Sequence, residues 1–143
     1  MTASLAVQKA VRARLVASNG VTSLVPEENI LDTNQRPAPS PSILLGEAQD
    51  VDANRTLARD FTSVFLTMHI WQREPSLVGV KMIAGAVRRA LGRLTRLDLD
   101  DEDFVCCDFR FESARFLRDP DGEMAHGVVT FVALIQERWS VEI

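Results

Sequence analysis

The sequence has no long apolar run, and this shortage excludes whole classes of protein. A helix that spans a bilayer needs about 20 mostly apolar residues, and no segment approaches that length, so we expect no membrane segment. The first residues, MTASLAVQKAVRARL, reach polar Gln8 and Lys9 too early for the apolar region of a secretory signal. We therefore expect no signal peptide and a protein that is made and assembled in the cytoplasm.

Positive charge is also scarce. The net charge is -4 at pH 7, with 16 basic and 20 acidic residues. A general nucleic-acid binder usually carries a basic field, so this class is disfavoured. Lys9 and Lys81 are the only lysines, so arginine supplies nearly all of the positive charge. Arginine suits planar, bidentate pairing at interfaces, although a genome-wide codon bias gives the same count.

Cysteine occurs twice, at the neighbouring positions Cys106 and Cys107 in a predicted strand. Successive side chains of a strand point to opposite faces, so the pair cannot easily chelate one metal ion. We expect reduced, packed thiols rather than a metal site.

The 143 residues are predicted to form one domain, residues 1–143, of the α+β class. The segment SLAVQKAVRARLVASNG has apolar residues at helical spacing. Ser4 or Thr2 can cap its start, and Asn19 with Gly20 can supply a left-handed stop. A second helix is predicted in EPSLVGVKMIAGAVRRALGRL, with Ser76 as its cap.

Strands are predicted between and after these helices. A short extended piece is expected around Ile30 and Leu31, followed by the strand SILLGEA and a long mobile loop over residues 49–60. Three longer strands are predicted in FTSVFLTMHIWQR, FVCCDFRFESARFL and EMAHGVVTFVALIQERW. The RDPDG between the last two is a strong hairpin signal. We therefore expect an antiparallel β-sheet with two helices packed on one face and a long C-terminal β-hairpin.

The strand FTSVFLTMHIWQR has two partly apolar faces. The side chains alternate between Val64, Leu66, Met68 and Ile70 on one face, and Phe65, Thr67, His69 and Trp71 on the other. A strand of this kind is usually covered by helices on one side and by a loop or a partner on the other. This is the first indication of assembly.

The stretch FLRDPDGEMAHGVVTF gathers acidic residues, a glycine and a histidine, but it does not fit a known metal loop. An EF-hand needs a glutamate at its twelfth position, and the twelfth residue from Asp119 is Thr130. His126 has no second ligand near it in the sequence, and a lone strand histidine is typical of a satisfied polar residue. We expect no catalytic residue, cofactor or metal, and interpret the stretch as a hairpin tip.

Two charged clusters follow one another near the second helix. Its C-terminal end carries Arg88, Arg89, Arg93 and Arg96, and the next segment contains the acidic run Asp98 to Asp103. One interpretation is a solvated helix end and a charged turn. The other is that arginines of one subunit meet carboxylates of the next.

The order of these segments resembles a family of small phage proteins, the tail terminators (tail-completion or head–tail joining proteins) of long-tailed phages and gene transfer agents. The resemblance runs from about Leu5 to Glu137 and is carried most specifically by three segments. These are HIWQR at 69–73, FESARFLRDPDG at 111–122 and HGVVTF at 126–131. Residues 21–35 and the segment DLDDEDF match nothing diagnostic.

The resemblance implies a structural virion protein rather than an enzyme. Members look like subunits of a six-fold ring at the head–tail junction, which caps the tail tube, ends its polymerisation and joins it to the neck stopper or connector. DNA would pass through the lumen without specific binding, as suits an acidic protein. A ring needs two different patches on each subunit. The residues expected at the subunit interface are Phe65, Trp71, Arg88, Arg89, Arg93, Arg96, Asp100, Asp101 and Asp103.

The contact with tube or neck is expected on two loops, since loops that order on docking can join mismatched surfaces. The residues expected there are Asp50, Asp52, Arg55, Arg59, Arg118, Asp119 and Asp121. Alternatives remain open: another neck ring such as the stopper, an oligomeric scaffold unrelated to phages, or a small cytosolic α+β ligand-binding or enzymatic domain in which the sheet brings His69 and His126 together.

Overall fold

The computed structural model describes residues 2–33, 38–92, 96–120 and 122–138. Three α-helices, one 3-10 turn and five strands follow one another along the chain. They are α1 (Ala3–Val16), α2 (Asn19–Thr22), the turn Glu27–Asn29, β1 (Ile30–Leu31), β2 (Ser42–Asp52), β3 (Phe61–Arg73), α3 (Val78–Leu91), β4 (Phe104–Arg118) and β5 (Met124–Glu137). Among the described residues, no helix is both long and apolar enough to cross a membrane.

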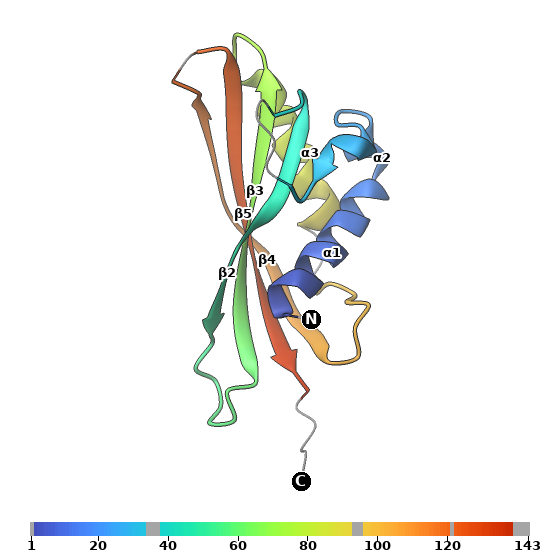
Figure 1. Ribbon diagram of the computed structural model, residues 1–143, viewed down its shortest axis with the longest axis vertical. Coiled ribbons are helices and arrows are strands. Elements are labelled where there is room, and N and C mark those ends of the chain that lie inside the picture. Colours follow the sequence, from blue (N-terminus) through green and yellow to red (C-terminus); the bar gives the residue numbers. More distant parts are fainter. Residues whose placement is uncertain (1, 34–37, 93–95, 121, 139–143) are drawn as a thin grey trace.

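The strands form one sheet in the order β1-β2-β3-β5-β4, and the helices lie together against one of its faces (Figure 1). All long strands pair antiparallel, whereas the two residues of β1 pair parallel to β2. The predicted α+β class, the helices on one face and the C-terminal hairpin are therefore confirmed. The β2–β3 and β4–β5 hairpins turn at opposite ends of the long sheet (Figure 1).

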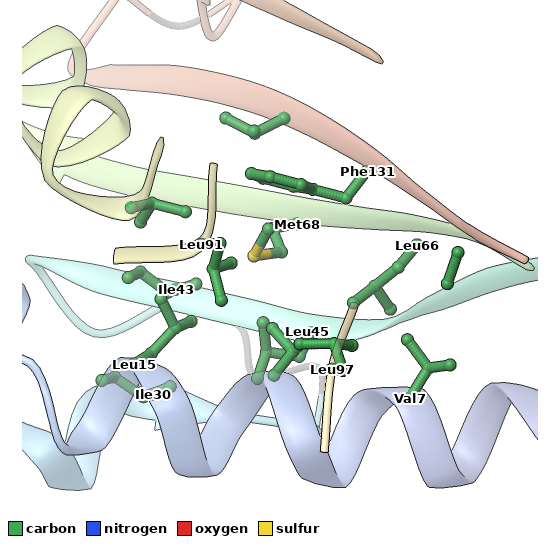
Figure 2. Packing of buried hydrophobic residues seen from close by; sticks show 14 of the residues in the cluster. Val7, Leu15, Ile30, Ile43, Leu45, Leu66, Met68, Leu91, Leu97 and Phe131 are labelled. Atoms are coloured by element: carbon green, nitrogen blue, oxygen red, sulfur yellow. The ribbon is translucent and has the colours of Figure 1, made fainter. Parts of the chain in front are cut away.

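The core lies between the sheet and the helices. Figure 2 shows Leu15 of α1 beside Ile30 and Ile43, and Val7 of α1 near Leu66 of the sheet, and all five are fully buried. The predicted inner face of β3 is confirmed, because Val64, Leu66, Met68 and Ile70 are each 0% exposed. Alternation along the strand thus gives the helices a continuous apolar surface to cover.

The central strand pair is regular and its neighbours are not. β3 and β5 pair without interruption from Phe61–Gln136 to Arg73–Met124. In contrast, β2 has a bulge between Leu44 and Glu47, and β4 has two irregularities, between Cys106 and Asp108 and between Phe111 and Ser113. A bulge bends its strand and increases the local twist. The bends therefore lie in the strands that flank the regular pair.

Two sequence-based expectations were wrong, one about a loop and one about the end of a helix. Residues 49–60 are not one mobile loop, because β2 continues to Asp52 and pairs with β3 along the way. The second half of β2 is exposed and mostly polar, as a loop usually is. A hairpin that projects beyond the core can nevertheless form without an apolar face. The helix α1 also ends at Val16 with a right-handed residue, and Asn19 and Gly20 begin α2 instead of forming a left-handed stop.

The helix starts agree with the sequence only in part. Thr2 caps α1 as expected, since its hydroxyl accepts the backbone N–H of Leu5. Ser76 is not the cap residue of α3, although its hydroxyl accepts from the N–H of Val78 at 3.3 Å. The Glu74 carboxylate instead accepts from the N–H of Gly79 at 2.9 and 3.1 Å. A carboxylate from the preceding segment therefore satisfies a donor that a cap residue usually satisfies.

Candidate functional site

The face of the sheet opposite the helices, called here the open face, carries side chains of β3 and β5. They are Phe65, Thr67, His69 and Trp71 on β3, and Val128, Thr130, Val132 and Leu134 on β5. The predicted placement of Phe65 and Trp71 on this face is confirmed, and both are half-buried. The hydroxyls of Thr67 and Thr130 lie 3.3 Å apart across the strand pair. The open face thus mixes apolar groups with polar groups that are paired with one another.

The two histidines of the chain meet on this open face. The register places Trp71 opposite His126, and His69 Nδ1 lies 2.8 Å from His126 Nε2. The indole of Trp71 stacks on the His126 ring with centroids 3.8 Å apart and planes 6° from parallel. The sheet therefore brings together two histidines that are far apart in the sequence, as one of the open alternatives expected. Antiparallel pairing joined two residues that are 57 positions apart in the chain.

The surroundings of His126 favour its neutral form. Burial, with repulsion from His69 and Arg115, lowers the pKa of His126 from 6.5 to about 4. His69 Nε2 lies 3.4 Å from a carboxylate oxygen of Glu47. If His126 donates its Nε2–H to Nδ1 of His69, the Nε2–H of His69 is directed toward Glu47. The cluster therefore runs from His126, which stacks on Trp71, through His69 to the carboxylate.

The chemistry of this cluster is limited by its ligand count. Within residues 2–33, 38–92, 96–120 and 122–138, no group of three or more His, Cys, Asp or Glu side chains could hold a metal ion. The nitrogens of the pair that face each other are already engaged in their mutual hydrogen bond. The cluster can therefore bind a proton at low pH and can offer a flat, half-buried aromatic surface to a partner.

The histidine cluster lies in an open cavity of about 670 Å³, called here the groove. Its apolar surface comes from Leu44, Trp71 and Leu117, beside the histidines. The groove is lined by Asp32, Thr33, Leu44, Gly46, Glu47, His69, Trp71, Leu117, Arg118, Asp119, Pro120 and His126. The lining thus combines three carboxylates and one guanidinium with apolar and aromatic side chains.

The bulge in β2 explains how Glu47 reaches the groove. Strict alternation after outward-facing Leu44 would turn Glu47 toward the helices. The extra residue between Leu44 and Glu47 restores Glu47 to the open face, where it meets His69. Gly46 occupies the bulge because a Cβ atom there would lie 2.7 Å from the backbone oxygen of Asp32.

The far end of the β2–β3 hairpin, residues 53–60 and called here the tip, is held by its own polar side chains. Arg59 Nη1 donates to Asp52 at 2.8 Å and to Asn54 at 3.0 Å. Thr56 donates to Asp60, and this bond, with one from Gln136, lowers the pKa of Asp60. Leu57 is 97% exposed at the apex. The tip therefore presents an apolar side chain from a loop with internal support.

The β4–β5 turn confirms the predicted hairpin. The N–H of Gly122 donates to the carbonyl of Asp119 at 2.8 Å, and Gly122 has the positive φ of 78° that the Asp-Gly signal predicts. Arg118 donates to the carbonyls of Glu74, Ser76 and Gly122 at 2.7 to 3.2 Å. Arg118 thus ties the turn to the segment before α3, and its contact with tube or neck stays a prediction.

The predicted interface arginines lie in different surroundings. Arg88 lies over the ring of Phe111, with 4.0 Å from its Cζ to the ring centroid, and Arg89 is exposed beside Gly85. Arg96 and Asp101 line one cavity of about 430 Å³ within the same chain.

Other residues predicted at the interface and in the contact loops are placed as follows. Asp100 and Asp103 are exposed, and the N–H of Asp103 donates to Asp101 at 2.8 Å. Arg93 and Asp121 lie outside the described residues. Whether the arginines meet carboxylates of another subunit stays a prediction.

The predicted arrangement of the cysteines is confirmed in part. Cys106 is buried and Cys107 is exposed, and both are free thiols. Burial raises the pKa of the Cys106 thiol, so it stays protonated and packs as a small apolar group.

Four residues of the groove and the tip were not among the predicted site residues: Leu44, Glu47, Leu57 and Leu117. Leu57 had a readable signal, since it is an isolated large apolar residue in a polar segment. Glu47 had none, because its direction depends on a bulge that no local pattern announces.

Comparison with known proteins agrees with this architecture. Two solved structures contain a chain of similar fold. A chain in the virion of a native gene transfer agent particle is 20% identical, with a TM-score of 0.74, and the match covers 90% of this chain and 93% of that chain. The gp17 protein of bacteriophage SPP1 is 18% identical, with a TM-score of 0.58, and the match covers 98% of this chain and 94% of that chain. At these identities the likeness shows the fold alone. No match was found among curated proteins.

A family model covers far more than half of the sequence. The model described as "Tail completion protein gp17" matches residues 9–136, which include the described helices and strands except residues 3–8 of α1 and Glu137 of β5. The chain therefore belongs to the tail completion protein gp17 family.

Proposed function

We propose that this tail-completion protein forms a ring of identical subunits, six by the family resemblance, which caps the tail tube, ends its polymerisation and joins the tail to the neck of the DNA-filled head. It acts as a structural part of the virion and not as an enzyme. The observation that carries the proposal is the open face. Four long strands leave a surface with half-buried Phe65 and Trp71 that no helix covers.

The open face supports assembly because Phe65 and Trp71 are only half-buried within one subunit. Burying aromatic side chains between subunits removes apolar area from water, and this is the main favourable term in association. A ring also needs two different patches per subunit that meet head to tail. The two hairpins at opposite ends of the sheet provide different surfaces, and the exposed Arg89 and Asp103 add charged ones.

Passage of DNA through such a ring fits the net charge of -4. Carboxylates along a channel repel a duplex and keep it from adhering to the wall. Once the residues that face the channel are identified, replacing their carboxylates with amides should slow ejection at low salt. Ejection that stays unchanged would contradict this part of the proposal.

The experiment that tests the main proposal is electron microscopy of particles from a producer that lacks this gene. Overlong tails of variable length, unattached to filled heads, are expected. Tails of normal length that fail to join heads would indicate a different neck ring, such as a stopper, while normal infectious particles would overturn an assembly role. Restoring the gene on a plasmid is the matched control.

A further inference from the structure

The tip is built to present an anchor rather than to fill a gap. Leu57 is 97% exposed, whereas the loop around it is fixed by hydrogen bonds of Arg59 to Asp52 and Asn54 and of Thr56 to Asp60. A large apolar side chain held in water by an ordered loop is the kind of group that becomes a buried anchor in an interface. The loss of conformational entropy on docking is small because hydrogen bonds already order the loop.

The tip also carries one uncompensated positive charge. Arg59 and Asp60 are both engaged within the hairpin, as described above. Arg55 is exposed, and no hydrogen bond or ion pair joins it to another of the described residues. The surface that receives Leu57 should therefore be apolar at its centre and acidic at its rim.

The groove has this character. Leu44, Trp71 and Leu117 line it with apolar side chains, and Asp32, Glu47 and Asp119 line it with carboxylates. The guanidinium of Arg118 also lines it, but its donors are directed to three backbone carbonyls. The groove therefore offers more negative than positive charge beside its apolar side chains.

The tip cannot reach the groove of its own chain. β3 runs from Phe61, next to the tip, to Trp71 in the groove, and ten steps of about 3.3 Å separate them by about 33 Å. Figure 1 shows the tip and the β4–β5 turn, which borders the groove, at opposite ends of the sheet. A complementary pair on opposite ends of one rigid body joins copies head to tail, which is a heterologous interface.

We propose that Leu57 and Arg55 at the tip of one subunit dock in the Trp71 groove of the next copy of this chain. Leu57 would contact Trp71 and Leu117, while Arg55 would face Glu47 and its neighbouring carboxylates. This inference rests on the proposed ring and names the contact that closes it. Head-to-tail contacts of this kind generate a ring when the rotation between copies closes.

Photo-crosslinking in the producer tests the contact. The chain carries Leu57→p-benzoylphenylalanine in place of the native copy, and the cells are irradiated during assembly. A matched control carries the same group as Met82→p-benzoylphenylalanine, on the exposed side of α3, away from tip and groove. Expected products are covalent multimers of this chain, linked from position 57 to peptides that contain Trp71, Leu117 or His126, and absent from the control.

A charge exchange sharpens the result. Arg55→Glu should lower the yield of linked multimer by about twofold to fivefold, since rim ion pairs are weak. Glu47→Arg should do the same, and the two changes together should restore the yield.

The opposite outcomes are distinct. Cross-links from position 57 to a tube or neck protein, to another part of this chain, or to nothing would overturn the tip-in-groove contact. Tail length in the same preparations reports separately on the proposed function. Normal tails without the multimers would reject the contact and leave tail termination standing, whereas normal particles from the gene deletion would reject both.

Discussion

The two faces of the β3–β5 pair share one backbone and differ in almost everything else. On the covered face, Leu66, Met68 and Phe131 are fully buried against helices and aromatic neighbours. On the open face, Thr67 bonds Thr130 and His69 bonds His126, and the apolar groups stay half-exposed. The covered face supplies the stability of the subunit. The open face keeps its polar groups satisfied while it leaves aromatic area for a partner.

The largest expected effect lies on the covered face. Phe131 stacks on Phe109 at 5.1 Å and meets Phe111 edge-on at 5.7 Å. We expect Phe131→Ala to lower the free energy of unfolding by about 3–5 kcal/mol, because it leaves a cavity in the core. Phe65→Ala on the open face is the matched control and should cost about 1 kcal/mol. Urea unfolding of the purified chains measures both, and equal losses would break the distinction between the faces.

The next largest effect on the free energy of unfolding is expected from the titration of His126, and only at acidic pH. The folded pKa of His126, about 4, is below its ordinary value of 6.5, so the unfolded chain binds the extra proton between these values. The contribution of His126 is therefore complete above about pH 6.5 and is lost progressively toward pH 4.

His126→Gln removes that titration. Between pH 7 and pH 4.5 we expect the variant to lose less free energy of unfolding than the parent does, by on the order of 1–2 kcal/mol. Urea titrations at several pH values measure the difference, and the carboxylates common to both chains cancel. Parallel pH profiles for the two proteins would show that His126 does not titrate as described.

A smaller effect is expected where a helix arginine covers an aromatic ring. Arg88→Met removes the charge over Phe111 and should lower the free energy of unfolding by about 0.5–1 kcal/mol. The neighbouring Arg89→Met is the control, since Arg89 is exposed and contacts no aromatic ring of the described residues. Thermal unfolding at low and moderate salt compares them. If Arg89→Met costs as much, the effect belongs to the helix end and not to the ring.

The smallest effect is expected at an ion pair on the surface. Arg73 and Glu123 lie 2.7 Å apart, with side chains 60% and 65% exposed. We expect Arg73→Met to change the free energy of unfolding by less than about 0.5 kcal/mol, because solvent screens such pairs. Adding salt to the parent protein should have as little effect. A loss above about 1 kcal/mol would mean that this end of the hairpin contributes more stability than its exposure suggests.

Much of the fold was predictable because its signals are local. The alternation of Val64 to Ile70 identified both faces of β3, and the Asp-Gly signal identified the turn at Gly122. The hairpin arm of β2 was not predictable in the same way. Its residues from Gly46 to Asp52 are all exposed, since the arm projects beyond the core, and burial is what gives a strand its periodic pattern.

The groove was harder to predict because its parts meet only through register. His69 and His126 become neighbours when β3 and β5 pair, and Glu47 joins them because of a single bulge at Gly46. A one-residue slip in either pairing would separate them, so no pattern within one segment could predict the cluster. The role in assembly proposed for the groove is argued from this geometry and from the charge around it.

The irregular edge of the sheet has a further consequence. β4 is the last strand of the sheet, and it carries two register shifts and the exposed charged residues Asp108, Arg110 and Glu112. Bulged, charged edges are poor templates for another strand. Strand-to-strand addition has no built-in end, as fibrils show. By resisting that mode, β4 leaves copies to meet through side chains, and contacts of that kind can close on themselves. A component of a finite particle is in this way protected from becoming an endless fibre.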